Sequence, residues 1–223
     1  MNTVDILFIV DITGSMHPFI EDARKRMKDI LNKVRNNKAV DIKVGLSLYR
    51  DHPSQGDDFV TTCFDLRDID KIQDILDKIT VGGGGDIPEA VIDGIIDGVS
   101  YMNWRTDSRR IIFLIGDAPA HGIVEEESCC QCGKTWGDAA YAIEDIQAIL
   151  YAIPLSDDLA TKTSFKYLSN YTGGFLIETD DAIEAISKTL NETLSDGSIE
   201  SKVLREFSQK SDKIEDMLKT SRS

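Results

Sequence analysis

The sequence predicts an α/β fold in which helices cover both faces of a doubly wound, mainly parallel sheet of about six strands. Short apolar runs of strand length alternate with segments whose apolar residues recur at helical spacing, which is the order of βα units. Two of these runs, residues 4–10 and 111–115, each lead into an acidic residue. The chain has 223 residues, of which 41% are hydrophobic, and no linker rich in Pro or Gly/Ser divides it, so one domain is favoured.

The first four elements follow from periodicity and loop length. Residues 4–10 form the first strand, and the helical spacing over 18–35 predicts a helix that lays its apolar stripe on the sheet. The strands expected over 42–49 and 59–64 are joined by the polar loop 51–58, which is too short for a crossover helix. They should therefore pair as an antiparallel hairpin, so that one edge of the sheet is antiparallel.

The same alternation continues beyond the hairpin. The glycines at 82–85 end one helix, and Pro88 is well placed in the first turn of the next. In order, we expect a helix over 69–79, a helix from about 87 to 102 whose apolar stripe spans 91–102, a strand over 111–115, an irregular segment over 118–136, a helix over 138–146, a strand over 149–154, a helix over 159–171, a strand over 175–177 and a closing helix over 183–194.

A break near 195–198 separates this domain, residues 1–196, from a tail over 197–223. Apolar residues in the tail recur in a 3-4 pattern among charges. The segment 199–218 is therefore a candidate contact for a partner helix or for an oligomer, although packing on the domain or fraying is favoured.

Charge and cysteine content narrow the functional classes. A formal net charge of −14 and a pI near 4.6 disfavour nucleic acid and anionic lipid as partners. The apolar stretches are far shorter than the roughly 20 residues that span a bilayer, and the first residues do not form a secretion signal. Three of the four cysteines crowd at Cys129, Cys130 and Cys132, unlike a spaced disulfide framework. We therefore expect a cytoplasmic protein that contacts no membrane.

Oxygen donors gather where the expected strands end. Asp11, Thr13 and Ser15 follow the first strand and offer hard oxygen donors for Mg²⁺, Mn²⁺ or Ca²⁺, although the same spacing fits a plain strand-to-helix turn. Asp86 follows the glycine run and Asp117 follows the strand over 111–115, where a helix cap and a turn residue are the plain alternatives. Ligands bind open α/β sheets outside the carboxyl ends of the strands, where the strand order reverses. Three such loops together favour one divalent cation site.

These motifs resemble the metal-ion-dependent adhesion site of the von Willebrand factor type A domain, over about residues 3–195. The resembling pieces are Asp11-x-Thr13-x-Ser15, the glycine-rich segment that ends in Asp86, and Asp117 within Ile115-Gly116-Asp117-Ala118-Pro119. Tyr49-Arg50-Asp51-His52, Gly-Gly-Gly-Asp-x-Pro-Glu and Gly-Asp-Ala-Pro-x-His-Gly are closer to an intracellular-type subgroup, which includes the domain found beside alpha-kinases, than to integrin or collagen-binding domains.

The resemblance implies a Rossmann-like fold and one Mg²⁺, Mn²⁺ or Ca²⁺ ion, with Asp11, Thr13, Ser15, Asp86 and Asp117 as ligands, directly or through water. In that family a carboxylate of a partner protein often completes the coordination, so the resemblance implies a protein-binding module and not an enzyme. The best-known members have Thr where this chain has Asp86. Our hypothesis is that the third carboxylate tightens metal binding and weakens the attraction for an acidic partner.

Other residues have weaker claims to a function. Arg50, Asp51, His52 and His121 are candidates for a partner-binding rim, with local ion pairs as the alternative. The Cys129 to Cys132 segment has the spacing of a zinc or redox pair, to which His121 could contribute, but a second pair of ligands is missing. Glu89 is interpreted as an acid in the first turn of a helix.

Two alternatives to metal-mediated partner binding stay open. One is a scaffold whose metal is structural or absent. The other, a metal-dependent phosphatase-type hydrolase, is disfavoured because Thr13 stands where an aspartyl phosphotransferase of the haloacid dehalogenase type needs a second carboxylate.

Overall fold

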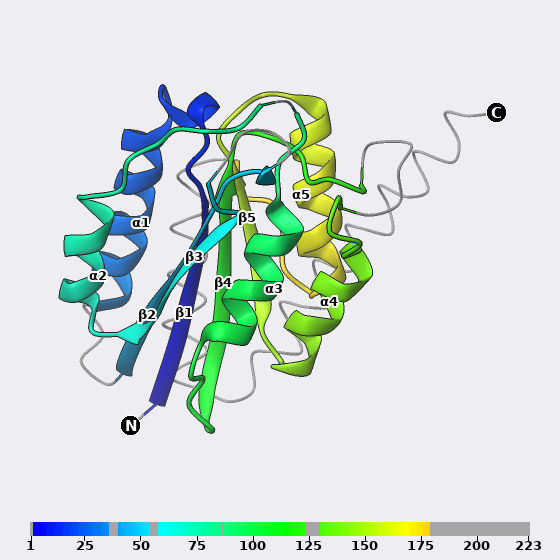
Figure 1. Ribbon diagram of the computed structural model, residues 1–223. Coiled ribbons are helices and arrows are strands. Elements are labelled where there is room, and N and C mark those ends of the chain that lie inside the picture. Colours follow the sequence, from blue (N-terminus) through cyan, green and yellow to red (C-terminus); the bar gives the residue numbers. More distant parts are fainter. Residues whose placement is uncertain (1, 36–39, 54–57, 86, 124–129, 179–223) are drawn as a thin grey trace.

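A mainly parallel sheet runs through the centre of the molecule, in the strand order β3-β2-β1-β4-β5 (Figure 1). The computed structural model describes residues 2–35, 40–53, 58–85, 87–123 and 130–178. Parallel pairing joins β1 to β2 and β4, and β4 to β5, whereas β3 is antiparallel to β2 and forms the predicted antiparallel edge. The strands are β1 (Asn2–Asp11), β2 (Val40–Tyr49), β3 (Thr61–Arg67), β4 (Ser108–Gly116) and β5 (Ile149–Pro154).

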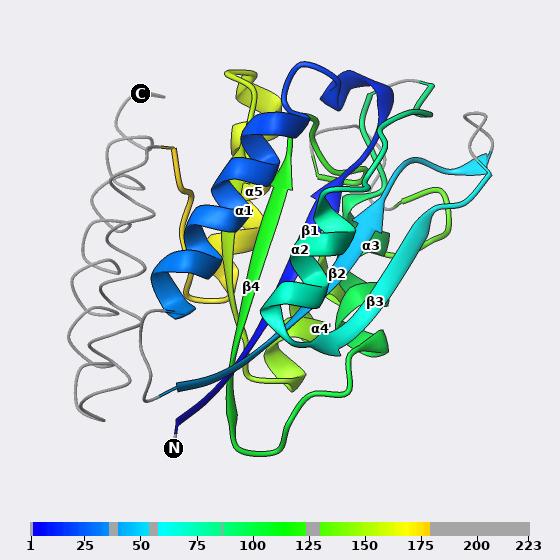
Figure 2. The same ribbon diagram turned by 90° about the vertical axis from the view of Figure 1, so that its left-hand side faces the viewer.

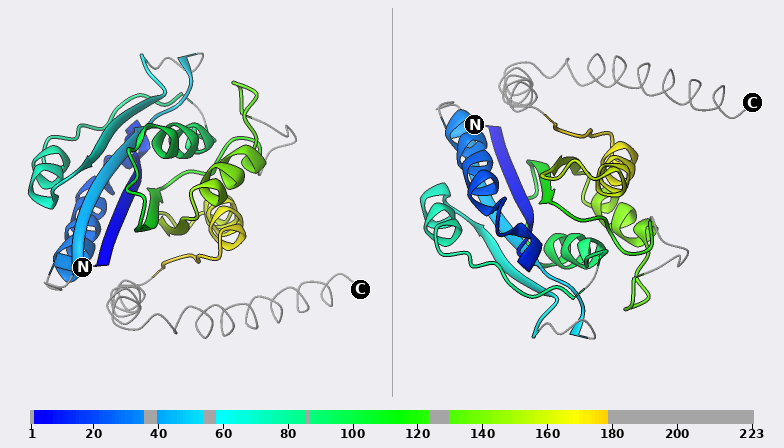
Figure 3. Two further views of the ribbon diagram at one scale, coloured as in Figure 1. Left: turned by 90° about the horizontal axis from the view of Figure 1, so that it is seen from below. Right: turned by 90° about the horizontal axis from the view of Figure 1, so that it is seen from above.

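Helices cover both faces of this sheet. Figure 2 shows α1 and α2 in front of the sheet, and the end-on views of Figure 3 place the green and yellow helices, α3 to α5, on the opposite face. A short 3-10 helix, η1 (Gly14–Met16), connects β1 to α1. The helices are α1 (Ile20–Arg35), α2 (Ile69–Leu76), α3 (Val91–Tyr101), α4 (Trp136–Asp145) and α5 (Leu159–Tyr171).

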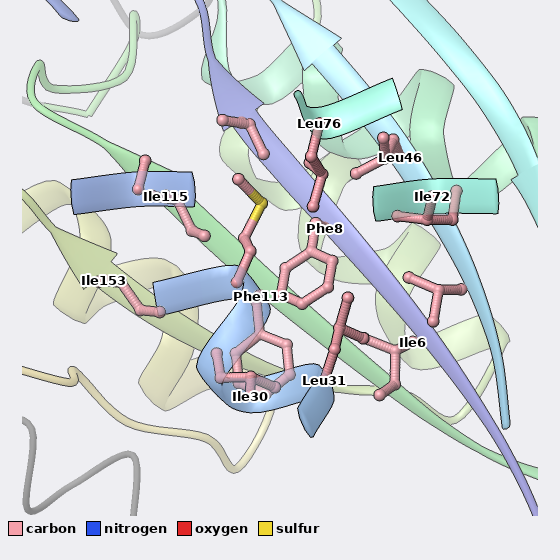
Figure 4. Packing of buried hydrophobic residues seen from close by; sticks show 14 of the residues in the cluster. Ile6, Phe8, Ile30, Leu31, Leu46, Ile72, Leu76, Phe113, Ile115 and Ile153 are labelled. Atoms are coloured by element: carbon pink, nitrogen blue, oxygen red, sulfur yellow. The ribbon is translucent and has the colours of Figure 1, made fainter. Parts of the chain in front are cut away.

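The central strand β1 buries both of its faces because successive side chains point to opposite sides. Ile6 and Phe8 pack with residues of α1 and α2, whereas Leu7 and Ile9 pack with residues of α3 and α5. Figure 4 shows the first of these layers, in which Phe8 stacks on Phe113 of β4 with 5.4 Å between the ring centroids. This two-sided burial explains the nearly continuous apolar run.

The acid within that run lies at the end of β1 away from Asp11. Asp5 is fully buried, and the guanidinium Nε of Arg105 lies 2.7 Å from its Oδ1. The hydroxyl of Ser108 donates to Asp5 Oδ2 at 2.6 Å. Its charge is therefore paired locally, at the amino end of the strand.

The predicted sixth strand is not formed in the described part of the chain. Residues 175–177 meet β5 at one point, an isolated parallel bridge between Leu176 and Ala152. There the Ala152 N–H donates to the Phe175 carbonyl at 3.1 Å and the Ile177 N–H donates to the Ala152 carbonyl at 2.7 Å. Among the described residues this segment therefore adds an isolated bridge, and not a sixth strand, to the five-stranded sheet.

The third helix also begins later than expected. It starts at Val91, because neighbouring loops hold the backbone of the two preceding residues. The Glu89 N–H donates to the Pro119 carbonyl at 3.0 Å and the Ala90 N–H donates to the Arg50 carbonyl at 3.1 Å. The placements of Pro88 and Glu89 in a first helical turn were therefore wrong.

The closing helix over 183–194 and the tail over 197–223, with its candidate contact over 199–218, lie outside the described residues. None of the described helices is both long and apolar enough to cross a membrane.

Candidate metal centre

The predicted oxygen donors lie where the strand order reverses. From β1 the chain passes through α1 to β2 on one side, and it later enters β4 on the other side. Asp11 is the last residue of β1, and Asp117 follows the last residue of β4, which lies alongside it. The carboxyl ends of two central strands thus bring both acids to the edge at which α/β sheets bind ligands.

Four of the five predicted ligands form one continuous hydrogen-bonded chain. The Thr13 hydroxyl donates to Asp11 Oδ1 at 2.6 Å, and the Thr13 N–H donates to the same oxygen at 2.8 Å. The Thr13 and Ser15 hydroxyl oxygens are 3.0 Å apart, and the Ser15 hydroxyl donates to Asp117 Oδ1 at 3.0 Å. Residues more than 100 positions apart in sequence are thus joined in one short arc of donors, which runs from Asp11 through Thr13 and Ser15 to Asp117.

Burial increases along this arc from Ser15 to Asp11. Ser15 is exposed and Asp117 is half-buried, whereas Thr13 and Asp11 are fully buried. Burial raises the pKa of Asp11 to about 7, an effect that hydrogen bonds from Thr13 oppose and the charge of Asp117 reinforces. Burial also raises the pKa of Asp117, although the Ser15 hydrogen bond opposes the shift. Among the described residues, no basic group opposes either shift.

The glycine run packs against the first loop and depends on glycine to do so. The Gly14 N–H donates to the Gly83 carbonyl at 2.8 Å, and the Gly82 N–H donates to the Ile12 carbonyl at 2.9 Å. Gly84 has a φ of 78°, and a Cβ there would lie 3.2 Å from Thr13 Cβ. This contact brings the backbone that precedes Asp86 to the chain of donors. Asp86 itself lies outside the described residues.

The negative charge of this region affects the pKa of Tyr49. Burial, followed by the charges of Asp11, Asp117 and Glu89, raises the pKa of the Tyr49 hydroxyl well above its usual value. A Cβ on Gly116 would lie 2.5 Å from the Tyr49 hydroxyl oxygen, so glycine is needed where that ring passes the strand end. Glu89, which the sequence placed in a helical turn, is instead a buried acid close to this site.

The residues present fit a divalent cation. The nearby Tyr49 hydroxyl opposes the rise in the pKa of Asp11, but Asp11 Oδ2 is buried without a hydrogen bond of ordinary geometry among the described residues. This is costly for a carboxylate oxygen unless a cation or water binds it. The donors are carboxylate and hydroxyl oxygens, the type that Mg²⁺, Mn²⁺ and Ca²⁺ prefer. An ion would also offset the mutual repulsion of the acids around Tyr49.

The residues predicted for a partner-binding rim are mostly turned inward. Asp51, His52 and His121 are buried, and His121 Nε2 lies 3.0 Å from Asp51 Oδ1. The guanidinium of the half-buried Arg50 lies over the Phe59 ring, 4.6 Å from its centroid. Partner contact through these four residues stays a prediction.

Comparison with known proteins places this geometry in a family context. Residues 5–132 match the family model described as von Willebrand factor A domain. A stretch of 120 residues, 53% of the chain, is 35% identical to "Alpha-protein kinase vwkA" of Dictyostelium discoideum. The match spans only 19% of that relative's length.

Solved structures share the architecture at low sequence identity. The pilus adhesin SpaC from Lactobacillus rhamnosus GG matches 87% of this chain and 31% of its own, with a TM-score of 0.61 and 17% identity. The proximal thread matrix protein 1 from the mussel byssus matches 86% of this chain and 46% of its own, with a TM-score of 0.58 and 15% identity. At these identities the likeness shows the fold alone.

Proposed function

The chain belongs to the von Willebrand factor A domain family, and from this premise we propose that it is a protein-interaction module whose partner binding depends on a divalent ion. The ion is Mg²⁺, or Mn²⁺ or Ca²⁺ in its place. Its ligands are Asp11, Thr13, Ser15 and Asp117, with Asp86 from the second loop.

One observation carries this proposal: the donor chain from Asp11 to Asp117, with Asp11 Oδ2 left buried and unpaired among the described residues. Hydrogen bonds within the chain already orient both hydroxyls, so little rearrangement is needed to bind an ion. Ser15 is the exposed end of the arc, and a partner would approach the ion from that side.

The proposed partner is a protein. The net charge of −14 favours a partner with a basic or mixed surface. With three carboxylates around one ion, the ion's remaining pull on a partner carboxylate is weaker than with two.

The metal site can be tested by titrating Mg²⁺ and Mn²⁺ into the protein in a calorimeter. Asp11→Asn keeps the shape of the side chain and a carbonyl oxygen for the Thr13 hydrogen bonds, but it removes the charge. We expect it to lower the affinity by more than about tenfold. Asp157→Asn is the matched control, because Asp157 is an exposed acid after β5 that pairs with Lys162 and has no place in the donor chain. Equal losses in the two variants would contradict the assignment.

Partner binding needs a separate test, a pull-down from the source cell with and without chelator. If the ion mediates binding, chelation and Asp11→Asn should both release the partner, while Asp157→Asn keeps it. The scaffold alternative predicts a lower melting temperature after chelation with the partner still bound. A phosphatase assay with each ion tests the hydrolase alternative. If the protein is a binding module, no turnover is expected with any of the ions.

A further inference from the structure

We propose a second metal site in this domain, a zinc site formed by His52, Asp93, Cys130 and Cys132 and separate from the oxygen site described above. One ligand atom from each of these residues lies within 4.8 Å of every other. The proposal does not rest on the proposed function, because none of these four residues belongs to the donor chain.

The four residues come from three segments that are distant in sequence. His52 follows β2, Asp93 lies in the first turn of α3, and the two cysteines lie in the loop that precedes α4. His52 Nε2 is 2.6 Å from Cys130 Sγ and 3.3 Å from Asp93 Oδ2. The Cys130 thiol donates to Asp93 Oδ2 at 3.0 Å, and the Cys132 thiol donates to Asp93 Oδ1 at 3.2 Å.

These donors and separations suit tetrahedral zinc. Zinc takes thiolate, imidazole and carboxylate ligands at about 2.0–2.3 Å, which places the ligand atoms of a tetrahedron roughly 3.3–3.8 Å apart. The contacts given above span 2.6–3.3 Å, at or below the lower end of this range, and every pair of ligand atoms lies within 4.8 Å. Small movements of side chains would open the cluster to that spacing.

The burial of the cluster fits a structural site. His52, Asp93 and Cys130 are at most 6% exposed, whereas Cys132 is exposed and leaves a path for an ion to enter. These groups now pair with one another, and a tetrahedrally coordinated ion would replace those contacts with one shared partner.

A neighbouring ammonium group offsets part of the local charge. Two thiolates and one carboxylate around Zn²⁺ leave a net charge of about −1 with a neutral imidazole. Lys134 Nζ lies 2.8 Å from Asp93 Oδ1 and 3.0 Å from Asp97 Oδ1, so an ammonium group already faces the cluster. An ion here would fasten the loop before α4 to α3 and to the segment after β2.

The donor set separates this site from the first one by chemistry. Thiolate sulfur and imidazole nitrogen select zinc over Mg²⁺ and Ca²⁺, whereas the donor chain from Asp11 to Asp117 contains only oxygen. The two sites can therefore be tested independently in the same protein.

The first experiment measures retained zinc. The full chain is reduced, loaded with one equivalent of Zn²⁺, desalted and analysed by elemental mass spectrometry. We expect one zinc ion per chain in the wild type, in Asp11→Asn and in Cys63→Ser, and loss of zinc in the Cys130→Ser/Cys132→Ser double variant. Cys63→Ser is the matched control, since Cys63 is a free cysteine in β3 outside the cluster. A wild type without retained zinc, or a double variant that keeps it, would overturn the proposal.

The second experiment remains informative if the double variant does not fold. Co²⁺ in place of zinc reports its ligands, because thiolate coordination produces charge-transfer absorption in the near ultraviolet. Replacing only the exposed thiol, in Cys132→Ser, should reduce that absorption by about half, as one of two sulfur ligands is lost. Cys63→Ser and Asp11→Asn should leave it unchanged. Bound Co²⁺ without this absorption, or equal absorption in Cys132→Ser, would show that the thiols are not ligands.

Discussion

At the scale of single residues, the proposed metal site links ion binding to the protonation of Asp11. Its pKa of about 7 arises mainly from burial, and it compares with 3.8 for an exposed aspartate. A carboxyl whose pKa is higher in the folded than in the unfolded state stabilises the protein at low pH. That contribution is lost as the pH rises from about 4 through about 7, because the buried group must then ionise. An ion bound to the carboxylate would remove this cost.

The first prediction concerns the rise in melting temperature caused by Mg²⁺. Protons and the ion compete for Asp11, so the rise should be larger at pH 8 than at pH 6. If binding the ion displaces one proton, the apparent affinity for Mg²⁺ should fall about tenfold for each pH unit below the pKa. Differential scanning fluorimetry at both pH values measures it. In Asp11→Asn the Mg²⁺ effect should be small and independent of pH; a wild-type effect that is equal at pH 6 and pH 8 would contradict this role.

The second prediction concerns Asp86, which follows the glycine run. If Asp86 adds a third carboxylate near the ion, then Asp86→Thr should weaken Mg²⁺ or Mn²⁺ binding by more than about threefold, since a neutral hydroxyl replaces a charged donor. Calorimetry on both proteins decides it. Binding by Asp86→Thr that equals or exceeds that of the wild type would sink the hypothesis.

The sequence alone predicted those site residues that directly follow a strand. Asp11 and Asp117 each follow an apolar run, so their meeting at one edge was predictable from the fold class. Asp93 and His52 were missed as ligand candidates, because their meeting with Cys130 depends on how two loops pack against α3. The Cys-x-Cys spacing at Cys130 and Cys132 was the available signal, and the missing ligands were non-local.

At the scale of elements, prediction was most accurate where burial sets a period. The amphipathic helix expected over 18–35 is α1, and the strand expected over 149–154 has the bounds of β5. Prediction failed where single backbone hydrogen bonds determine the structure, as at the late start of α3 and at the bridge of Leu176 to β5. Such bonds leave no periodic trace in the sequence.

The third prediction tests how α4 begins. The Thr135 hydroxyl accepts from the Asp138 N–H at 3.2 Å, and the Asp138 carboxylate accepts from the Thr135 N–H at 2.8 Å, which together form a capping box. Thr135→Ala should therefore lower the free energy of unfolding by about 1 kcal/mol. Urea denaturation with chelator and reductant present measures this without any contribution from metal.

Thr163→Ala is the control for that measurement. Thr163 is exposed inside α5, where alanine is the better helix former, so the same substitution should be neutral or slightly stabilising. A loss at Thr163 as large as that at Thr135 would show that the effect does not come from the cap.

At the scale of the whole molecule, the excess of acids makes any cation stabilising to some degree. The chain carries a net charge of −14, so its acidic groups repel one another, and 0.1 M salt screens this repulsion beyond about 10 Å. General screening and site binding by Mg²⁺ thus act in the same direction. Only site binding should depend on the identity of the ion and on Asp11.

The last prediction separates the two effects. Mg²⁺ should raise the melting temperature more than NaCl at equal ionic strength, because site binding adds about 2.7 kcal/mol when the ion is present at 100 times its Kd. The excess over NaCl should vanish in Asp11→Asn and persist in Asp157→Asn, which has the same net charge. If Asp157→Asn also loses the excess, stabilisation by Mg²⁺ follows from total charge, and the donor chain between Asp11 and Asp117 does not hold the ion.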